Sequence, residues 1–174
     1  MAHVYLHSAV DDHSRLAYTE ALEDERAATA AAFWHRTASF FAAHGISIRR
    51  VLTDNGACYR SHTWADAVAA TGTKRKRTRP YTPRTNGKVE RYNGTLAREW
   101  AYVRDYTSEH ERRVALADFL NYYNHERPHS SLGGKPPISR TPASGYRVTR
   151  GHLPQPPAVV PQQLTIEDAM EPTS

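Results

Sequence analysis

The pattern of hydrophobic and polar positions predicts a pair of strands near the start of the chain. Residues 4–10 and 16–22 each read as a strand, and the Asp-Asp-His-Ser segment at 11–14 between them is typical of a turn. We therefore expect a β-hairpin. A further strand is predicted at 48–53, and because a helix precedes it we expect it to run parallel to its neighbour.

Two helices are predicted around that strand. Acidic residues at 23–25 favour the start of the first helix, and Gly45 is expected to end it. Ser61 is expected to cap the second helix, which continues to Ala70 and stops at Gly72. The apolar stripe of the first helix is Ala30, Phe33, Trp34, Thr37, Phe41 and His44.

Two more helices are predicted in the second half of the chain. One runs from about residue 86 to about 103. The other begins at a capping box formed by Ser108 and Glu111 and ends near Tyr123. Since strands and helices alternate after the opening hairpin, the expected fold class is α/β, with a mixed sheet flanked by helices.

Composition changes near Gly133, which suggests a division of the chain. Eight of the 11 prolines lie beyond this residue, and apolar runs there are brief. We interpret 1–132 as one folded domain and 133–174 as a Pro-rich C-terminal tail.

Charge and cysteine content narrow the class of protein. The chain has 174 residues and a formal net charge of +5, so a polyanionic partner is plausible. A single cysteine fits a reducing compartment, and we expect a cytoplasmic protein, associated with the nucleoid if the source is prokaryotic. No apolar stretch is long enough to cross a membrane.

Asp54 and Glu90 are the candidate catalytic residues. Asp54 ends the apolar strand at 48–53, where ligands of α/β sheets commonly bind, and Glu90 lies near the start of the predicted 86–103 helix. Two carboxylates in such positions can share divalent metal ions that drive phosphodiester chemistry. The alternatives are an ordinary Asp-Asn-Gly turn at Asp54 and a glutamate that merely borders the core at Glu90.

The predicted helix around Glu90 has two faces. Its apolar stripe is Val89, Tyr92, Leu96, Trp100 and Val103. A second stripe on the far side, facing solvent or phosphates, is Lys88, Arg91, Thr95 and Arg98. Glu90 lies on the flank of the apolar stripe with Asn86, Asn93 and Ala97, where it could lean over the edge of a sheet.

A basic stretch leads into this helix. It begins with a strand candidate at 74–78 and continues through a loop at 79–87. We expect its cationic and polar side chains to bind DNA phosphates beside the metal site. A solvated edge strand and a localisation signal are the alternatives. The candidate DNA-binding residues are Lys74, Arg75, Lys76, Arg77, Arg79, Arg84, Asn86, Lys88 and Arg91.

These features together resemble the catalytic core of insertion-sequence transposases of the retroviral-integrase type. The similarity covers roughly residues 4–140, and the 35 residues between Asp54 and Glu90 match the spacing of the family. The segments that carry it, in family order, are Leu6-His7-Ser8-Ala9-Val10-Asp11-Asp12-His13-Ser14-Arg15, Leu52-Thr53-Asp54-Asn55-Gly56, Pro83-Arg84-Thr85-Asn86-Gly87-Lys88-Val89-Glu90-Arg91-Tyr92-Asn93 and Tyr123-Asn124-His125-Glu126-Arg127-Pro128-His129.

The resemblance implies a ribonuclease H-like fold and a DNA-joining chemistry. Such proteins hold two Mg²⁺ or Mn²⁺ ions with an Asp-Asp-Glu triad, cut transposon ends and join them to target DNA, acting as homo-multimers when full length. Asp54 matches the second acid and Glu90 the third.

The first acid of the family has no counterpart in this chain. It belongs to a strand preceding residues 6–10, whereas Asp11 and Asp12 match the hairpin turn, which we do not expect to reach the site. We therefore interpret the chain as N-terminally truncated and expect it to be inactive as given. Whether this chain is an enzyme is left open. A sheet without its central strand would leave backbone groups unpaired.

Two rival functions remain beside the transposase core. One is a non-catalytic DNA-binding remnant, which would inhibit a full-length transposase. The other, weaker, is a stand-alone ribonuclease H-like nuclease, against which the basic loop and the 123–129 segment count.

Overall fold

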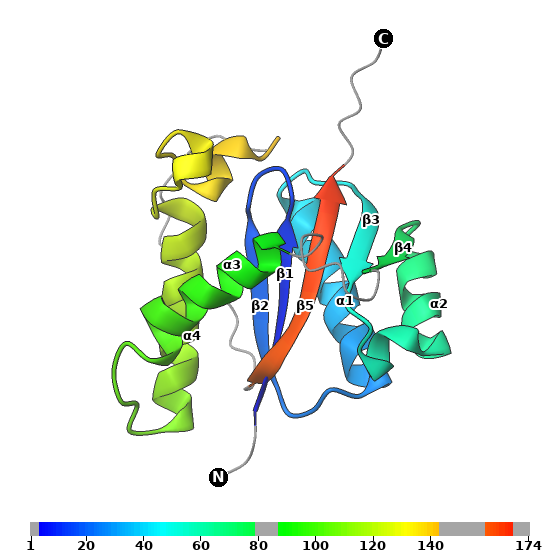
Figure 1. Ribbon diagram of the computed structural model, residues 1–174, viewed down its shortest axis with the longest axis horizontal. Helices are drawn as coiled ribbons and strands as arrows, with labels where there is room; N and C mark the ends of the chain where they lie inside the picture. Colours follow the sequence, from blue (N-terminus) through cyan, green and yellow to red (C-terminus); the bar gives the residue numbers. More distant parts are fainter. Residues whose placement is uncertain (1–3, 79–86, 143–158, 169–174) are drawn as a thin grey trace.

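One mixed sheet organises the part of the chain that the computed structural model describes, residues 4–78, 87–142 and 159–168 (Figure 1). Within these ranges the sheet has five strands in the order β2-β1-β5-β3-β4. The strands are β1 (Tyr5–Asp11), β2 (Ala17–Leu22), β3 (Ile48–Thr53), β4 (Lys74–Arg77) and β5 (Val159–Asp168).

The predicted hairpin is confirmed as the antiparallel pair β1–β2. Its turn is held by Asp11, whose Oδ2 accepts hydrogen bonds from the Ser14 backbone N–H (2.7 Å) and from the Ser14 hydroxyl (2.5 Å). Such a carboxylate satisfies donors that the tight turn leaves free. Asp11 therefore stabilises the hairpin, in agreement with its assignment to the turn.

Strand β3 pairs with two neighbours in opposite senses. The expected parallel pairing holds on one side only: β3 runs parallel to β4, to which the helix at His62–Ala70 connects it, and antiparallel to β5. β5 in turn runs parallel to β1, so it fills the position between the hairpin and β3. Part of the Pro-rich 133–174 segment thus supplies the backbone partners that β1 and β3 need, a strand that the sequence pattern did not predict.

Helices cover both faces of the sheet (Figure 1). α1 (Ala27–Ala43) and α2 (His62–Ala70) pack on one face, and α3 (Gly87–Leu96) and α4 (Glu109–His125) on the other. The short helical turns are Ala57–Arg60, Ser130–Leu132 and Pro137–Arg140. No helix in the described ranges is long and apolar enough to span a membrane.

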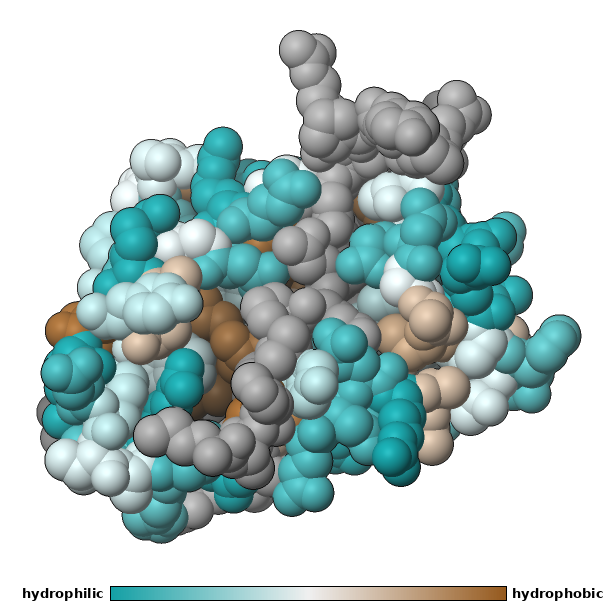
Figure 2. All heavy atoms as spheres, turned by 60° about the horizontal axis from the view of Figure 1, so that its bottom comes forward, coloured by the Kyte–Doolittle hydropathy of each residue, from teal (hydrophilic) through white to brown (hydrophobic). Residues whose placement is uncertain are grey.

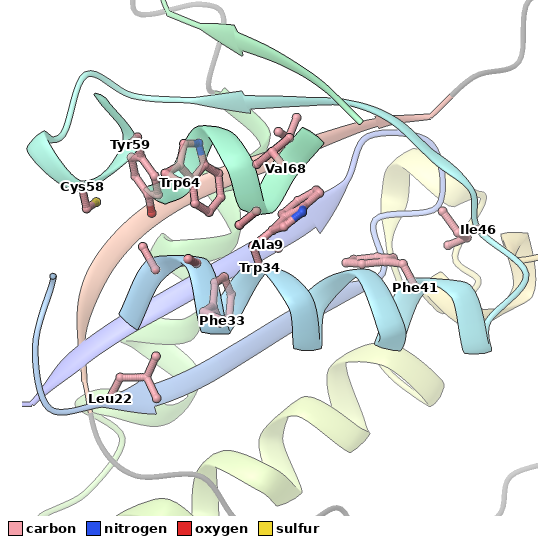
Figure 3. Packing of buried hydrophobic residues seen from close by; sticks show 14 of the residues in the cluster. Ala9, Leu22, Phe33, Trp34, Phe41, Ile46, Cys58, Tyr59, Trp64 and Val68 are labelled. Carbon is pink, nitrogen blue, oxygen red and sulfur yellow. The ribbon is translucent and has the colours of Figure 1, made fainter. Parts of the chain in front are cut away.

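An aromatic core lies between the sheet and α1 and α2 (Figure 3). Trp34 of α1 meets Trp64 of α2 edge to face, with ring centroids 5.7 Å apart, and its Nε1 donates to Thr71 Oγ1 (3.0 Å). Phe33 and Phe41 of α1 are fully buried beside them. The first helix therefore buries its predicted stripe, except that His44 lies at the C-cap and is only half-buried.

A second core lies on the face that carries α3 and α4. Val89, Tyr92 and Leu96 of α3 pack with Leu116 and Phe119 of α4 in this cluster. Figure 2 shows a view of the exterior in which hydrophilic residues predominate and hydrophobic ones are visible chiefly in one hollow on its left. The side chains on one face of the sheet therefore pack against α1 and α2, and those on the other face pack against α3 and α4.

The helix around Glu90 is shorter than predicted. α3 ends at Leu96, and the chain continues as a π-helical segment at Ala97–Ala101. A π turn adds a residue to the helical turn and changes which side chains face inward. Trp100 remains buried, but Val103, predicted to belong to the apolar stripe, is 57% exposed.

Side-chain caps begin two of the helices as the sequence predicted. Ser61 Oγ accepts from the Trp64 N–H (3.1 Å), and Ser108 Oγ accepts from the Glu111 N–H (3.1 Å). The Glu111 carboxylate accepts from the Thr107 N–H (2.8 Å), so the return half of the capping box reaches one residue further than the motif implies.

Candidate functional site

Asp54 lies directly after β3, where a tight turn begins. Its Oδ1 accepts a hydrogen bond from the Gly56 N–H (2.7 Å), which fixes the carboxylate against the turn. A Cβ at position 56 would lie 2.9 Å from this oxygen and 3.4 Å from the Tyr59 ring. Any residue larger than glycine would therefore displace the Asp54 carboxylate. Asn55 Nδ2 donates to Thr78 O (3.2 Å) and ties the turn to the end of β4.

The strand register relates Asp54 to the two faces of the sheet. Val51 is buried in the core beneath α1 and α2. Side chains alternate along a strand, so Leu52 follows the opposite face, which α3 and α4 cover, whereas Asp54 comes after the last residue of β3 and lies in the turn. Asp54 itself is half-buried.

Glu90 lies in the first turn of α3 and is exposed. Its neighbours anchor the helix: Val89 is buried, and the Tyr92 hydroxyl forms a 2.6 Å hydrogen bond with Thr19 Oγ1 of β2. Burial raises the pKa of the Tyr92 phenol far above its usual range, so it stays neutral. Within the described part of the chain the Glu90 carboxylate makes no hydrogen bond or ion pair.

Asn93 lies one helical turn after Glu90. Both polar atoms of its side-chain amide are buried without a hydrogen-bond partner. Buried amides are normally satisfied, and an orphaned one marks a place where a further group belongs. The helical spacing of three residues puts this amide and Glu90 on the same side of α3.

The N-terminal half of α3 crosses the middle of the sheet (Figure 1). α3 contacts β1 and β5, the two strands on the hairpin side of β3. The loop that joins β4 to α3 lies outside the described residues, and with it Arg79, Arg84 and Asn86.

Strand β4 carries a short run of cations at the edge of the sheet. Lys74, Arg75, Lys76 and Arg77 are all exposed, and the Thr78 N–H donates to Thr53 O (2.9 Å) to align the end of this strand with the Asp54 turn. Exposed edge lysines discourage strand pairing with other chains, the alternative that the sequence left open.

Lys88 is engaged within the protein. Its ammonium forms an ion pair with the Asp12 carboxylate and donates to Asp12 O (3.3 Å). The hairpin turn therefore reaches the start of α3, because α3 contacts β1. Arg91, one turn further on, is exposed.

Sequence analysis missed the structural role of the 123–129 segment. Asn124 hydrogen-bonds to Ala17 of β2, and Arg127 forms a bidentate ion pair with Glu99 (2.6 and 2.8 Å). In the sequence, this segment was noted only as one of the segments that carry the family resemblance, and that resemblance does not predict which residues it contacts.

Carboxylate oxygens are the ligands that Mg²⁺ and Mn²⁺ prefer, and Asp54 and Glu90 supply that chemistry. Among the described residues there is no group of three or more His, Cys, Asp or Glu side chains that could hold a metal ion.

Two family models, both described as integrase core domain, match the chain. One matches residues 1–83 and the other 71–137. The putative transposase InsD of insertion element IS2E from Escherichia coli K12 is 31% identical over 86 residues, which is 49% of this chain and 39% of the relative. The transposase InsD of IS2A/D/F/H/I/K from Escherichia coli has the same identity over 86 residues, with 29% of its length covered. The chain therefore matches well under half the length of these relatives.

Solved structures show the same fold. A chain of the cryoEM structure of the simian T-cell lymphotropic virus intasome in complex with the PP2A regulatory subunit B56 gamma aligns with a TM-score of 0.62. The alignment covers 88% of this chain and 60% of that one, at 16% identity. This likeness shows a ribonuclease H-like integrase fold. The two adjoining integrase core domain matches together span residues 1–137 and assign this chain to the integrase core family, and the relatives that it resembles in sequence are transposases of insertion elements.

Proposed function

We propose that this chain is the DNA-cutting and DNA-joining core of a transposase, working by two-metal phosphodiester chemistry in which Asp54 and Glu90 are metal ligands. The observation that carries the proposal is the setting of the two carboxylates. The Asp54 carboxylate accepts from the Gly56 N–H after β3, and the exposed Glu90 carboxylate in the first turn of α3 has no partner among the described residues. We propose that the two carboxylates lie within about 5–6 Å of each other, or reach that distance by one rotamer change, which would let them share a metal ion.

The metal ions, when bound, would activate a water or a 3′-hydroxyl and stabilise the leaving oxygen. The protein's own contribution is to place the oxygens. Gly56 orients the Asp54 carboxylate, and the buried neighbours Val89 and Tyr92 fix the helix turn that carries Glu90. The Asn93 amide, whose two polar atoms are buried without partners, would be free to hydrogen-bond to a water or to a phosphate oxygen.

DNA is the proposed partner, both as transposon ends and as target. The exposed β4 cations and Arg91 are proposed to hold phosphates, together with Arg79, Arg84 and Asn86 in the connecting loop and Lys88 once released from Asp12. The intact protein is proposed to act as a homo-multimer, since the ends of one element must be brought together.

The 174-residue chain by itself is proposed to be inactive in strand transfer. A site with two of three carboxylates binds divalent ions weakly. The second candidate is therefore a DNA-binding remnant that inhibits a full-length transposase, favoured by the exposed cations of β4, which need no metal to bind DNA. Nucleotides upstream of Met1 discriminate these functions: an Asp-bearing strand in frame, or reachable by a frameshift, favours the enzyme.

The test is a titration of the purified chain with Mn²⁺, in which binding is measured by the paramagnetic broadening of the NMR signals of the protein. Weak binding is expected for the unaltered protein and loss of it for Asp54→Asn and for Glu90→Gln. Asp66→Asn on α2 is the matched control, because Asp66 is an exposed carboxylate on the other face of the sheet.

Two outcomes would overturn the proposal. If Asp54→Asn and Glu90→Gln bind Mn²⁺ as the unaltered chain does, the two residues are not the metal ligands. If the chain joins oligonucleotide ends in Mg²⁺, the proposed inactivity is wrong.

A further inference from the structure

A polar pocket lies beside α3, on a different face of the helix from Glu90. Its volume is about 230 Å³, and it forms where α3, the segment after α4 and the end of the β1–β2 hairpin turn meet. The basic side chains that line it are Arg15, Lys88, Arg91, Arg98, Arg127 and His129. No lining residue of this described pocket is acidic, so its field is positive.

Only part of that charge is neutralised within the protein. Lys88 is paired with Asp12, and Arg127 is paired with Glu99. The guanidinium groups of Arg15, Arg91 and Arg98 have no ion pair within the described residues. Three unpaired arginines around one hollow repel each other, and an anion between them relieves that repulsion.

Buried donors point to where such an anion belongs. Arg15 Nη1 and His129 Nε2 are both buried without a hydrogen-bond partner. The Ser130 and Ser131 side chains line the same wall. Because buried polar atoms are normally satisfied, Arg15 Nη1 indicates a missing acceptor, and His129 Nε2 would donate to the same acceptor once the imidazole is protonated. A group with several acceptor oxygens satisfies guanidinium, imidazole and hydroxyl donors together.

The hairpin turn fixes Arg15 for this role. Its backbone is left-handed (φ 67°), an unusual conformation for a residue other than glycine, and the Arg15 N–H donates to Asp11 O (3.0 Å). The buried Asp11 carboxylate holds the same turn through Ser14. The side chain is thus presented to the pocket by a rigid, internally bonded turn.

From these contacts we infer that the pocket binds one backbone phosphate of DNA, at a subsite separate from the Asp54–Glu90 site. The inference rests on the proposed function for the identity of the partner. A volume of about 230 Å³ exceeds the roughly 30 Å³ share of one water several-fold, so a phosphodiester with part of its sugar has room. Tyr92 and Tyr123 supply the wall for the apolar side of the sugar.

The ionisation of His129 adds a measurable consequence. Burial lowers the pKa of His129, and the neighbouring Arg127 and Arg15 guanidinium groups lower it further, against the opposing effects of Glu99 and of a hydrogen bond that the imidazole donates to the Tyr123 backbone. The imidazole is therefore neutral at pH 7. A phosphate beside it favours the charged form, so the pKa of His129 rises when DNA binds.

The experiment measures duplex DNA binding in EDTA as a function of salt concentration. Arg91→Gln, Arg98→Gln and the double variant are compared with the unaltered chain. Arg91 is exposed on α3 and Arg98 is exposed on the π-helical segment that follows it, so the fold is retained. The matched control is Arg26→Gln with Arg49→Gln, which removes the same charge from exposed positions outside the pocket.

Counterion release gives a slope of about −0.9 in log K against log salt for each phosphate neutralised. Both arginines face the same phosphate, so their effects on the slope should not add. The double variant should flatten the slope by about one unit, and each single variant by no more than that. The control should leave it unchanged. Bound DNA should also raise the pKa of the His129 imidazole, followed by NMR, and should do so less in the double variant.

The outcomes separate this subsite from the proposed function. If the unaltered chain binds no DNA, the proposed function fails first. If it binds DNA and the double variant behaves as the control does, the pocket inference is wrong. Inorganic phosphate is the second probe: if it saturates the His129 shift while the variants leave DNA binding intact, the pocket takes free phosphate and the DNA assignment is overturned.

Discussion

Asn124 near the end of α4 and Ala17 at the start of β2 are joined by two hydrogen bonds. Asn124 Oδ1 accepts from the Ala17 N–H (2.9 Å), and Asn124 Nδ2 donates to Ala17 O (2.8 Å). Both residues are buried. The side-chain amide thus replaces the neighbouring strand that an edge strand such as β2 lacks, and it locks α4 to the sheet.

Replacing this amide should destabilise the fold. Asn124→Ala leaves the N–H and C=O of Ala17 buried without partners, each costing about 1–3 kcal/mol, so we expect a loss of about 2–4 kcal/mol. Urea unfolding measures it. Asn121→Ala, on the same helix, should cost about 0.5 kcal/mol or less. Equal losses in the two variants would show that the paired hydrogen bonds contribute nothing special.

A methyl group at position 56 should disturb Asp54 specifically. Gly56 has φ −52°, which any residue adopts, so Gly56→Ala acts through the 2.9 Å contact with Asp54 Oδ1 and not through backbone strain. We expect Mn²⁺ binding to weaken while stability falls by only about 1 kcal/mol. Gly87→Ala, whose Cβ would meet nothing within 4 Å, is the control. Unchanged Mn²⁺ binding in Gly56→Ala would mean that the turn does not position the carboxylate.

The β4 cations should bind phosphates and not bases. Replacing Lys76 and Arg77 with alanine should weaken binding to all DNA sequences alike and flatten the salt slope by about one unit per lost contact. Both side chains are exposed, so folding should be unaffected. Loss of preference for one sequence with an unchanged salt slope would identify these residues as base readers instead.

His7 should make stability depend on pH. Burial lowers the pKa of His7 despite the hydrogen bond between Nε2 and Asp24 O (3.1 Å), and its Nδ1 is buried without a partner. The unfolded chain therefore binds the proton more readily, so stability is full above about pH 6.5 and falls as the pH drops below it. His7→Gln, which keeps a donor for Asp24 O, should flatten this dependence between about pH 7 and pH 5. His35→Gln, at an exposed position, is the control and should leave the pH dependence of the unfolding free energy unchanged. If His7→Gln also leaves it unchanged, a group other than His7 causes the pH dependence.

Strand β5 should be needed for the stability of the sheet. Deleting 143–174 removes the partner that pairs with both β1 and β3 and leaves two rows of backbone groups open. We expect a lower unfolding temperature and aggregation, measured by calorimetry and light scattering. A shorter deletion of 169–174, which spares β5, is the control. An unfolding temperature unaffected by the longer deletion would show that β5 does not support the sheet.

Local sequence determined most elements because their physical causes are local. The turn at 11–14, the Ser61 and Ser108 caps and the stripe of α1 each depend on residues within a few positions of one another, and all are confirmed apart from His44 in the stripe. The family followed from short segments in order. The roles of Asp54 and Glu90 stay predictions, since they depend on a metal and a DNA partner.

Tertiary structure decided what depends on distant segments. Only long-range packing gives β5 its place between β1 and β3, since its backbone pairing is set by partners more than 100 residues away. The same applies to the Lys88–Asp12 ion pair and to the pocket that Arg15, Arg98 and His129 share. A sequence fixes which charges a helix face carries, whereas which of them stay unpaired depends on the segments that fold against it, because pairing is a contact across space and not along the chain.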